Sequence, residues 1–142
     1  MYHRLAATAL ALAGGTAALA QDFEVEIKFY LQPDSSGSRT ENRSIALEDG
    51  TLELEAHNAL EDVFTERPAT DAEVSLILDL VQSRLGAVEL RGSDSPDYPY
   101  VEVDIEFDGG DVAVELEYDF APGAVPQEFI DLQNRFFNGA FE

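Results

Sequence analysis

The sequence contains no cysteine and very little histidine. Without cysteine, the chain has no disulfide and no thiolate for catalysis or metal binding. His57 is the only histidine beyond the first twenty residues, so a Ser-His pair would depend on it and a site of several histidines is excluded there. GxSxG, HExxH and phosphate-cradling glycine motifs are also absent. We therefore expect a non-catalytic protein without a cofactor.

Positive charge is equally scarce, with 8 lysines and arginines against 29 acids and a net charge of −21. Binding to a nucleic acid backbone requires clusters of lysine and arginine, and so does binding to an anionic membrane surface. Both partners are therefore excluded as working hypotheses. The charge permits a cationic protein partner or divalent cations.

Long apolar runs are missing as well, because the longest is residues 5–13 near the N-terminus. It follows Arg4 and leads to Ala18-Leu19-Ala20, a small-x-small site typical of secretory signal peptides. We predict a signal peptide over residues 1–20, cleavage before Gln21, and a periplasmic or extracellular location. Residues 21–142 would form one acidic domain with a net charge of −22, because the removed segment carries one of the eight basic residues and no acid.

Alternating apolar residues predict a strand over Phe23–Leu31, and a second alternating stretch over Ser44–Ala56 predicts one bent strand or a small hairpin. Asn58–Phe64 has capping-box spacing and is interpreted as a short helix that begins just after His57. Thr70 and Glu73 form a clearer capping box before a helix that Gly86 ends.

After a further pair of strands, Pro126 precedes a second long helix over Gln127–Phe137. The order of elements is therefore ββαββα. It predicts an α+β domain in which an antiparallel sheet of about four strands carries two helices on one face.

Two segments without apolar periodicity are candidate binding loops, because binding residues concentrate on loops held by a rigid scaffold. The first runs from Pro33 to Ser44 and the second surrounds the turn before Tyr100. The candidate binding residues are Asp34, Ser35, Ser36, Arg39, Arg43, Asp97 and Tyr98. The aromatic tail of Phe136, Phe137 and Phe141 could belong to the same surface or cover the core.

The segment VEVDIEFDGGDVAVELEYD, residues 101–119, combines strict alternation with eight acids. A two-residue loop at Gly109-Gly110 would pair apolar residues on one face: Val101 with Tyr118, Val103 with Leu116, Ile105 with Val114 and Phe107 with Val112. On the other face, like charges would lie opposite one another. This face could be a solvated surface suited to a saline exterior, a docking surface for a basic partner, or a weak divalent-cation site.

The spacing Asp104-x-Glu106-x-Asp108-Gly109, with Glu115 six residues further on, resembles that of an EF-hand calcium loop. Both flanks alternate with period two, however, whereas an EF-hand loop lies between helices. Strand geometry would also spread these acids along one face, about 6.6 Å apart. The candidate metal-binding residues are therefore Asp104, Asp108 and Asp111, with weak binding at most.

The ββαββα order, the segment Asp97-Tyr98-Pro99-Tyr100-Val101 entering a strand, the Gly-Gly hairpin and the proline-started last helix together resemble the emfourin family. The resemblance covers most of residues 23–137. The sequence departs from the family in residues 33–44, where PDSSGSRTENRS replaces a glycine-rich segment, and in the signal peptide. Emfourins are small protein inhibitors of thermolysin-like metallopeptidases.

The resemblance implies a protein-binding module with a peptidase-inhibitor role as its most specific form, and no inhibitory residue can be carried over. The alternative is a small acidic structural or accessory protein adapted to a saline exterior. We expect an unidentified protein partner, and a monomer or a weak homo-oligomer.

Overall fold

A computed structural model describes residues 23–36, 41–57, 62–86, 97–110 and 112–142. The predicted signal peptide lies outside the described residues. The described residues form six strands and two helices, in chain order β1 (Glu24–Gln32), β2 (Glu41–Glu48), β3 (Thr51–His57), β4 (Asp62–Pro68), α2 (Asp71–Gly86), β5 (Tyr100–Asp108), β6 (Ala113–Phe120) and α3 (Gln127–Phe136).

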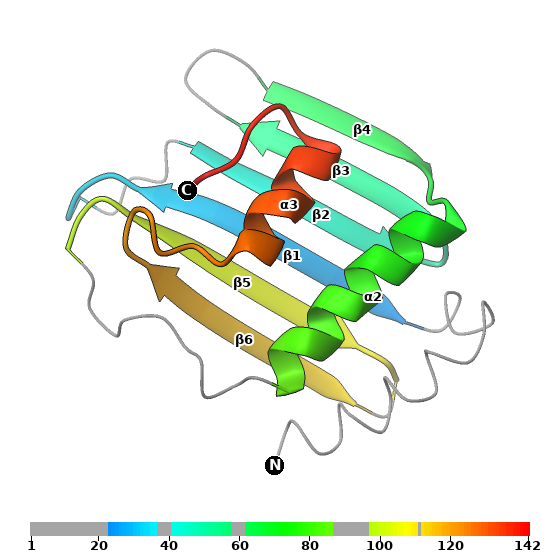
Figure 1. Ribbon diagram of the computed structural model, residues 1–142. Coiled ribbons are helices and arrows are strands. Elements are labelled where there is room, and N and C mark those ends of the chain that lie inside the picture. The colour runs from blue at the N-terminus through cyan, green and yellow to red at the C-terminus, as the bar shows by residue number, and fades with distance from the viewer. Residues whose placement is uncertain (1–22, 37–40, 58–61, 87–96, 111) are drawn as a thin grey trace.

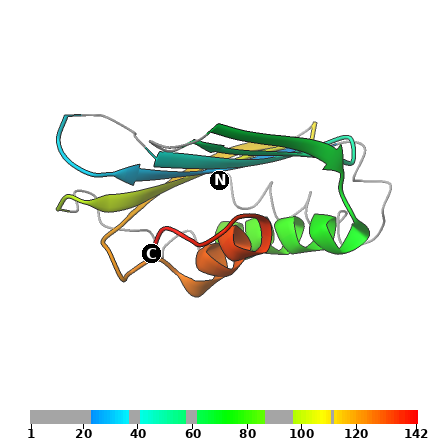
Figure 2. The same cartoon turned by 90° about the horizontal axis from the view of Figure 1, so that it is seen from above.

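All six strands form one antiparallel sheet in the order β4-β3-β2-β1-β5-β6, and both helices cover the same face (Figures 1 and 2). The prediction of a sheet of about four strands in ββαββα order is therefore wrong. The first two strands of that prediction correspond to four strands, because the second alternating stretch is a hairpin and a further strand follows it.

The core lies between the sheet and the helices. β1 is central, and its side chains at Val25, Ile27 and Phe29 are fully buried on the helix side. Phe129 of α3 is also fully buried, and its ring packs at about 6 Å from three aromatic rings of the sheet, those of Phe29, Tyr118 and Phe120. The burial of these apolar side chains between the sheet and the helices stabilises the fold.

The stretch predicted as one bent strand or a hairpin is a hairpin. Asp49 and Gly50 connect β2 to β3, and both have positive φ angles of 51° and 76°. A two-residue turn with both residues in the left-handed region matches the twist of the flanking strands, and aspartate and glycine tolerate that region.

The short helix predicted over Asn58–Phe64 is wrong in its described part, because residues 62–64 belong to β4; residues 58–61 lie outside the described residues. Consequently His57 ends strand β3 and does not precede a helix. The register of β4 with β3 runs without a bulge from Asp62 opposite His57 to Pro68 opposite Thr51.

The β5–β6 hairpin is confirmed, but its predicted register is wrong by two residues. Phe107 lies opposite Val114 instead of Val112, and Asp104 lies opposite Glu117. The connection is longer than two residues, since the Gly109 amide donates to the carbonyl oxygen of Val112 at 2.8 Å and the Gly110 amide donates to Asp108 Oδ1 at 2.9 Å. An even shift leaves each side chain on its predicted face.

The capping box of α2 is confirmed in atomic detail. The Glu73 amide donates to Thr70 Oγ1 at 3.1 Å, and the Thr70 amide donates to Glu73 Oε1 at 2.9 Å. Arg67 of β4 adds two bonds to the same carboxylate, at 2.8 and 2.7 Å. These bonds, first those from the arginine, lower the pKa of Glu73 to about 2. The start of α2 is thereby fixed to the end of β4.

Candidate functional site: the acidic face of the sheet

The sheet face that the helices leave uncovered carries most of the acids of the strands. The pairing register places every even-numbered residue of β1, β2, β4, β5 and every odd-numbered residue of β3 and β6 on this side. We call this surface the acidic face. It carries fourteen carboxylates, from Glu24, Glu26, Glu48, Glu53, Glu55, Asp62, Glu66, Glu102, Asp104, Glu106, Asp108, Glu115, Glu117 and Asp119.

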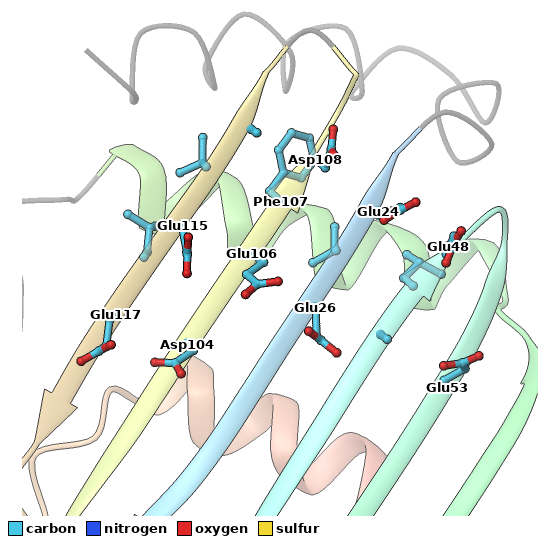
Figure 3. A pocket seen from close by; sticks show the side chains of 16 residues that line it. Glu24, Glu26, Glu48, Glu53, Asp104, Glu106, Phe107, Asp108, Glu115 and Glu117 are labelled. Carbon is cyan, nitrogen blue, oxygen red and sulfur yellow. The ribbon is translucent and has the colours of Figure 1, made fainter.

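The acidic face is hollowed over its centre. A depression of about 910 Å³ extends across five adjacent strands, β3, β2, β1, β5 and β6, and Figure 3 shows its lining side chains. Glu26, Glu106 and Asp104 point from neighbouring strands to the side opposite the helices (Figure 3). A broad, open depression of this kind can receive a protein surface or an extended chain, whereas small-molecule sites are usually enclosed and mostly apolar.

Carboxylates lie directly opposite one another at seven positions of this face. The pairs are Glu24 with Glu48, Glu24 with Asp108, Glu26 with Glu106, Glu53 with Glu66, Glu102 with Asp119, Asp104 with Glu117 and Glu106 with Glu115. Each such pair costs about 0.2–1 kcal/mol. The fold therefore tolerates a considerable repulsion on this face.

The repulsion raises the pKa of two glutamates on this face. The negative charge of Glu48 raises the pKa of Glu24, and a carboxyl–carboxylate hydrogen bond with Glu66 raises the pKa of Glu53. Both effects arise because a proton on one member relieves the like charge of the other.

The cations on the acidic face in the described strands are already bonded to acids of the same face. Lys28 Nζ lies 3.3 Å from Glu26 Oε1. His57 Nδ1 lies 2.8 Å from Asp62 Oδ1, and its Nε2 lies 3.5 Å from Glu55 Oε2. The hydrogen bond with Asp62 is the main reason that the pKa of His57 is raised. These two residues neutralise only a small part of the face.

One group of acids has ligand atoms close enough to share a cation. Oxygens of Glu102, Asp104 and Glu117 lie within 4.8 Å of one another. Glu102 is only 5% exposed and accepts a hydrogen bond from Gln32 Nε2 at 3.0 Å. Carboxylate oxygens suit hard cations such as Ca²⁺, but acids crowd this whole face, so proximity alone does not define a site.

Of the predicted metal residues, the structure brings only Asp104 into that group. Asp108 lies four residues further along β5, and Asp111 lies outside the described residues. The EF-hand-like spacing falls on a strand, a turn and a second strand instead of a loop between helices. The spacing therefore reflects acids at alternate strand positions.

The predicted loop residues fall into three situations. Asp34, Ser35 and Ser36 form an exposed turn after β1, where the Ser36 amide donates to Asp34 Oδ1 at 2.9 Å. Arg39 lies outside the described residues. Asp97 and Tyr98 are exposed beside the start of β5, and the ring of Tyr98 lies 5.2 Å from that of Tyr100. Because Gln32 pairs with Tyr100, the two exposed turns lie at the same end of the sheet (Figure 1).

Arg43 is not a loop residue, contrary to its predicted role. It lies in β2 on the helix side, where its guanidinium stands 4.5 Å from the ring centre of Phe141 and 5.5 Å from that of Phe137. It also donates to Gly139 O at 2.7 Å and to Gln133 Oε1 at 3.2 Å. Arg43 therefore fixes the C-terminal segment to the sheet, and the aromatic tail packs against the core.

The acids of β5 and β6 were predicted to share a face, but the acids of β1, β3 and β4 were not predicted to lie on it. The signal was present as glutamates at alternate positions in EVEIK and ELE. Each pattern shows that the acids of one strand share a face. Whether acids of different strands lie on one common face depends on the order of the strands in the sheet.

No protein-family model matches the sequence, and no curated protein matches it. No helix in the described part of the chain is long and apolar enough to span a membrane.

Proposed function

We propose that the protein is an exported, non-catalytic binding module whose acidic face binds a cationic protein. The observation that supports this proposal is the segregation of charge: fourteen carboxylates share one hollowed face with Lys28 and His57, while the other face is covered by helices. Complementary charge accelerates the encounter with a partner and fixes its orientation.

The placement of the arginines supports the same proposal. Arg67 is bonded to Glu73, and Arg84 is bonded to Glu128. Arg43 lies between aromatic rings on the helix side. These three cations stabilise the helix layer and do not neutralise the acidic face, which leaves its charge available to a partner.

A second candidate is an accessory protein adapted to a saline exterior. It is favoured by the seven opposed acid pairs, because their mutual repulsion is screened within a few ångström at high ionic strength. The two candidates differ in one respect: only the binding module loses a partner when acids of this face are neutralised.

A more specific form of the first proposal is inhibition of a thermolysin-like metallopeptidase. It rests on the resemblance to emfourins in the segment Asp97–Val101, the Gly-Gly hairpin and the proline-started last helix, because the ββαββα order that also carried the resemblance is wrong. The exposed turns at one end of the sheet, around Asp34 and Tyr98, are the surface that we assign to that role. A peptidase assay with increasing amounts of the protein tests it. Full peptidase activity in the presence of a large excess of the protein would rule out inhibition. That result would not bear on the binding of a cationic protein by the acidic face.

The decisive experiment for the acidic face is a pull-down from the exported fraction with the protein as bait. The double variant Glu26→Gln/Glu106→Gln removes two adjacent charges at the centre of the face. Asp79→Asn/Asp131→Asn, on exposed positions of α2 and α3, changes the net charge equally and is the matched control. We expect binding to weaken about tenfold or more in the first variant alone. Equal weakening in both would show that only net charge matters and would contradict the proposal.

Export itself is tested by the mass of the secreted protein. Cleavage after Ala20 predicts a mature chain that begins at Gln21. A secreted protein that retains residues 1–20 would refute this part of the proposal.

A further inference from the structure

β4 forms one edge of the sheet and is the most exposed strand of the fold (Figure 1). Its only strand partner among the described residues is β3, and six of its seven residues are exposed. The exposed positions include two large apolar side chains, Val63 at 42% and Phe64 at 58%. A regular edge strand with exposed apolar side chains is a template on which another strand can pair.

The backbone groups that β4 offers can be assigned from the register. The Ala69 amide donates to Gly50 O at 2.8 Å, so the residue after β4 bonds towards β3. In an antiparallel ladder, successive residues bond to opposite sides. Pro68, which has no amide hydrogen, therefore faces outwards, and so do the N–H and C=O groups of Glu66, Phe64 and Asp62.

The same three residues point their side chains to the acidic face. A strand added to this edge would place its own side chains about 4.5–5.5 Å from theirs. Asp62 and Glu66 would each face a cation, with Glu53 and Glu55 of β3 close behind. Phe64 would present its ring, which also attracts a cation. On the helix side, Val63 and Thr65 favour β-branched apolar residues.

We propose that the cationic partner binds by adding an extended segment to the outer edge of β4, with lysine or arginine at alternate positions over the acidic face. This inference rests on the proposed function and names the form of its partner. The partner's backbone would form hydrogen bonds with the outward N–H and C=O groups of Asp62, Phe64 and Glu66. Its lysine or arginine side chains would lie beside the acidic face and neutralise part of its charge.

A second copy of this chain is a poorer occupant of the same edge. Two β4 strands paired antiparallel about Phe64 would place Asp62 of one copy opposite Glu66 of the other, twice. Like charges directly opposite are destabilising, and each copy carries a net charge of −21 before any processing. A cationic strand replaces both repulsions by attractions.

The test uses the exported protein and two capped heptapeptides of equal charge: Lys-Val-Lys-Val-Lys-Val-Lys, called the Lys-Val peptide, and the same sequence with every backbone amide N-methylated, called the N-methyl peptide. The first can form a strand with alternate cations, and its pattern reads the same in both directions. The N-methyl peptide keeps the side chains and the charge but has no backbone amide hydrogen to donate to β4, in whichever direction it lies. Titration calorimetry with each peptide separates attraction to the acidic face from strand addition.

Two substitutions at one position isolate the backbone contribution. Phe64→Pro removes an amide hydrogen that faces outwards and so keeps the bonds to β3, as proline does on natural edge strands. Phe64→Ala removes the ring but keeps that hydrogen. We expect the Lys-Val peptide to bind about tenfold tighter than the N-methyl peptide. This advantage should persist in part with Phe64→Ala and disappear with Phe64→Pro.

A second measurement covers the case in which Phe64→Pro does not fold. In the unsubstituted protein, the Lys-Val peptide should slow hydrogen exchange at the amides of Phe64 and Glu66, with no matching protection along β6. Absence of that protection would overturn the proposal without any variant.

The remaining outcomes separate this inference from the proposed function. Equal binding of both peptides, weakened by Glu26→Gln/Glu106→Gln but not by Phe64→Pro, would overturn strand addition and retain the acidic face as the binding surface. No binding by either peptide would overturn both. A concentration-dependent dimer that Phe64→Pro abolishes would overturn the cationic occupant in favour of a second copy.

Discussion

The two faces of the sheet use charge in opposite ways. On the helix-covered face, Arg67 and Arg84 are each bonded to a glutamate, and Arg84 also lies 5.2 Å from the ring centre of Phe129. On the acidic face, carboxylates stand opposite carboxylates at seven positions. A chain with few cations can therefore use its arginines to stabilise the helix-covered side of the sheet. The other face keeps a negative charge that lowers the stability of the fold.

The largest effect should come from the core of the covered face. Phe129→Ala removes a fully buried ring that packs against Phe29, Tyr118 and Phe120, and we expect a loss of about 3–5 kcal/mol in the free energy of unfolding. Phe64→Ala, on the acidic face, is the matched control and should change it by about 0.5 kcal/mol or less. Chemical denaturation measures both. Equal losses would contradict the division of roles between the faces.

The next effect concerns the bond that joins β4 to α2. The pKa of Glu73 in the fold, about 2, lies below its usual value of 4.5. Its contribution is therefore present above pH 4.5 and is lost as the pH falls towards 2. We expect Glu73→Gln to cost about 2 kcal/mol at pH 7, because the partner Arg67 is partly exposed to solvent, and little at pH 2. A cost that does not vary between these pH values would show that the charge of Glu73 is unimportant.

Salt should act mainly on the acidic face. Screening of the opposed carboxylates should raise the free energy of unfolding by about 1–2 kcal/mol between low and high sodium chloride, without a saturable step. Calcium chloride at equal ionic strength should add little to this. A saturable calcium effect on the melting temperature, lost in Glu117→Gln, would instead identify the group of Glu102, Asp104 and Glu117 as a cation site.

The smallest effect is expected for one opposed pair. Glu53→Gln removes one carboxylate of the opposed pair of Glu53 and Glu66, and should stabilise the protein by about 0.5 kcal/mol or less at pH 7. Because the pKa of Glu53 is raised in the fold, protonation favours the folded state. The gain from the substitution should therefore vanish as the pH falls below 4.5. A destabilised variant would show that this pair is not repulsive.

The sequence allowed the prediction of those elements that bury a face. β1, the β5–β6 hairpin and the capping box of α2 were predicted because alternation or cap spacing marks each of them. β4 was missed for a physical reason: it is exposed on both faces, so DVFTERP shows no alternation between apolar and polar residues. The register of the β5–β6 hairpin was missed because a Gly-Gly pair suits both a two-residue loop and part of a longer one.

The candidate site was predictable only in part for a related reason. Alternation shows which residues of one strand share a face, but the order of strands decides which faces adjoin. Glu26 and Glu106 are direct neighbours, although β1 and β5 are separated by three strands and a helix in the sequence. Arg43 was misplaced because its segment lacks periodicity, and its aromatic partners lie about a hundred residues away, in the C-terminal segment.

The central position of β1 also governs the order in which the sheet can be completed. β1 to β4 form successive hairpins, whereas β1 and β5 join residues between 68 positions apart (Gln32 with Tyr100) and 84 positions apart (Glu24 with Asp108). If the hairpins of β1 to β4 form before β5 pairs with them, β1 is an edge strand with several apolar residues, and such an edge is a template for self-association. In that case the glutamates of β1 at positions 24 and 26 would repel other copies at that edge, as charged gatekeeper residues do beside apolar strands.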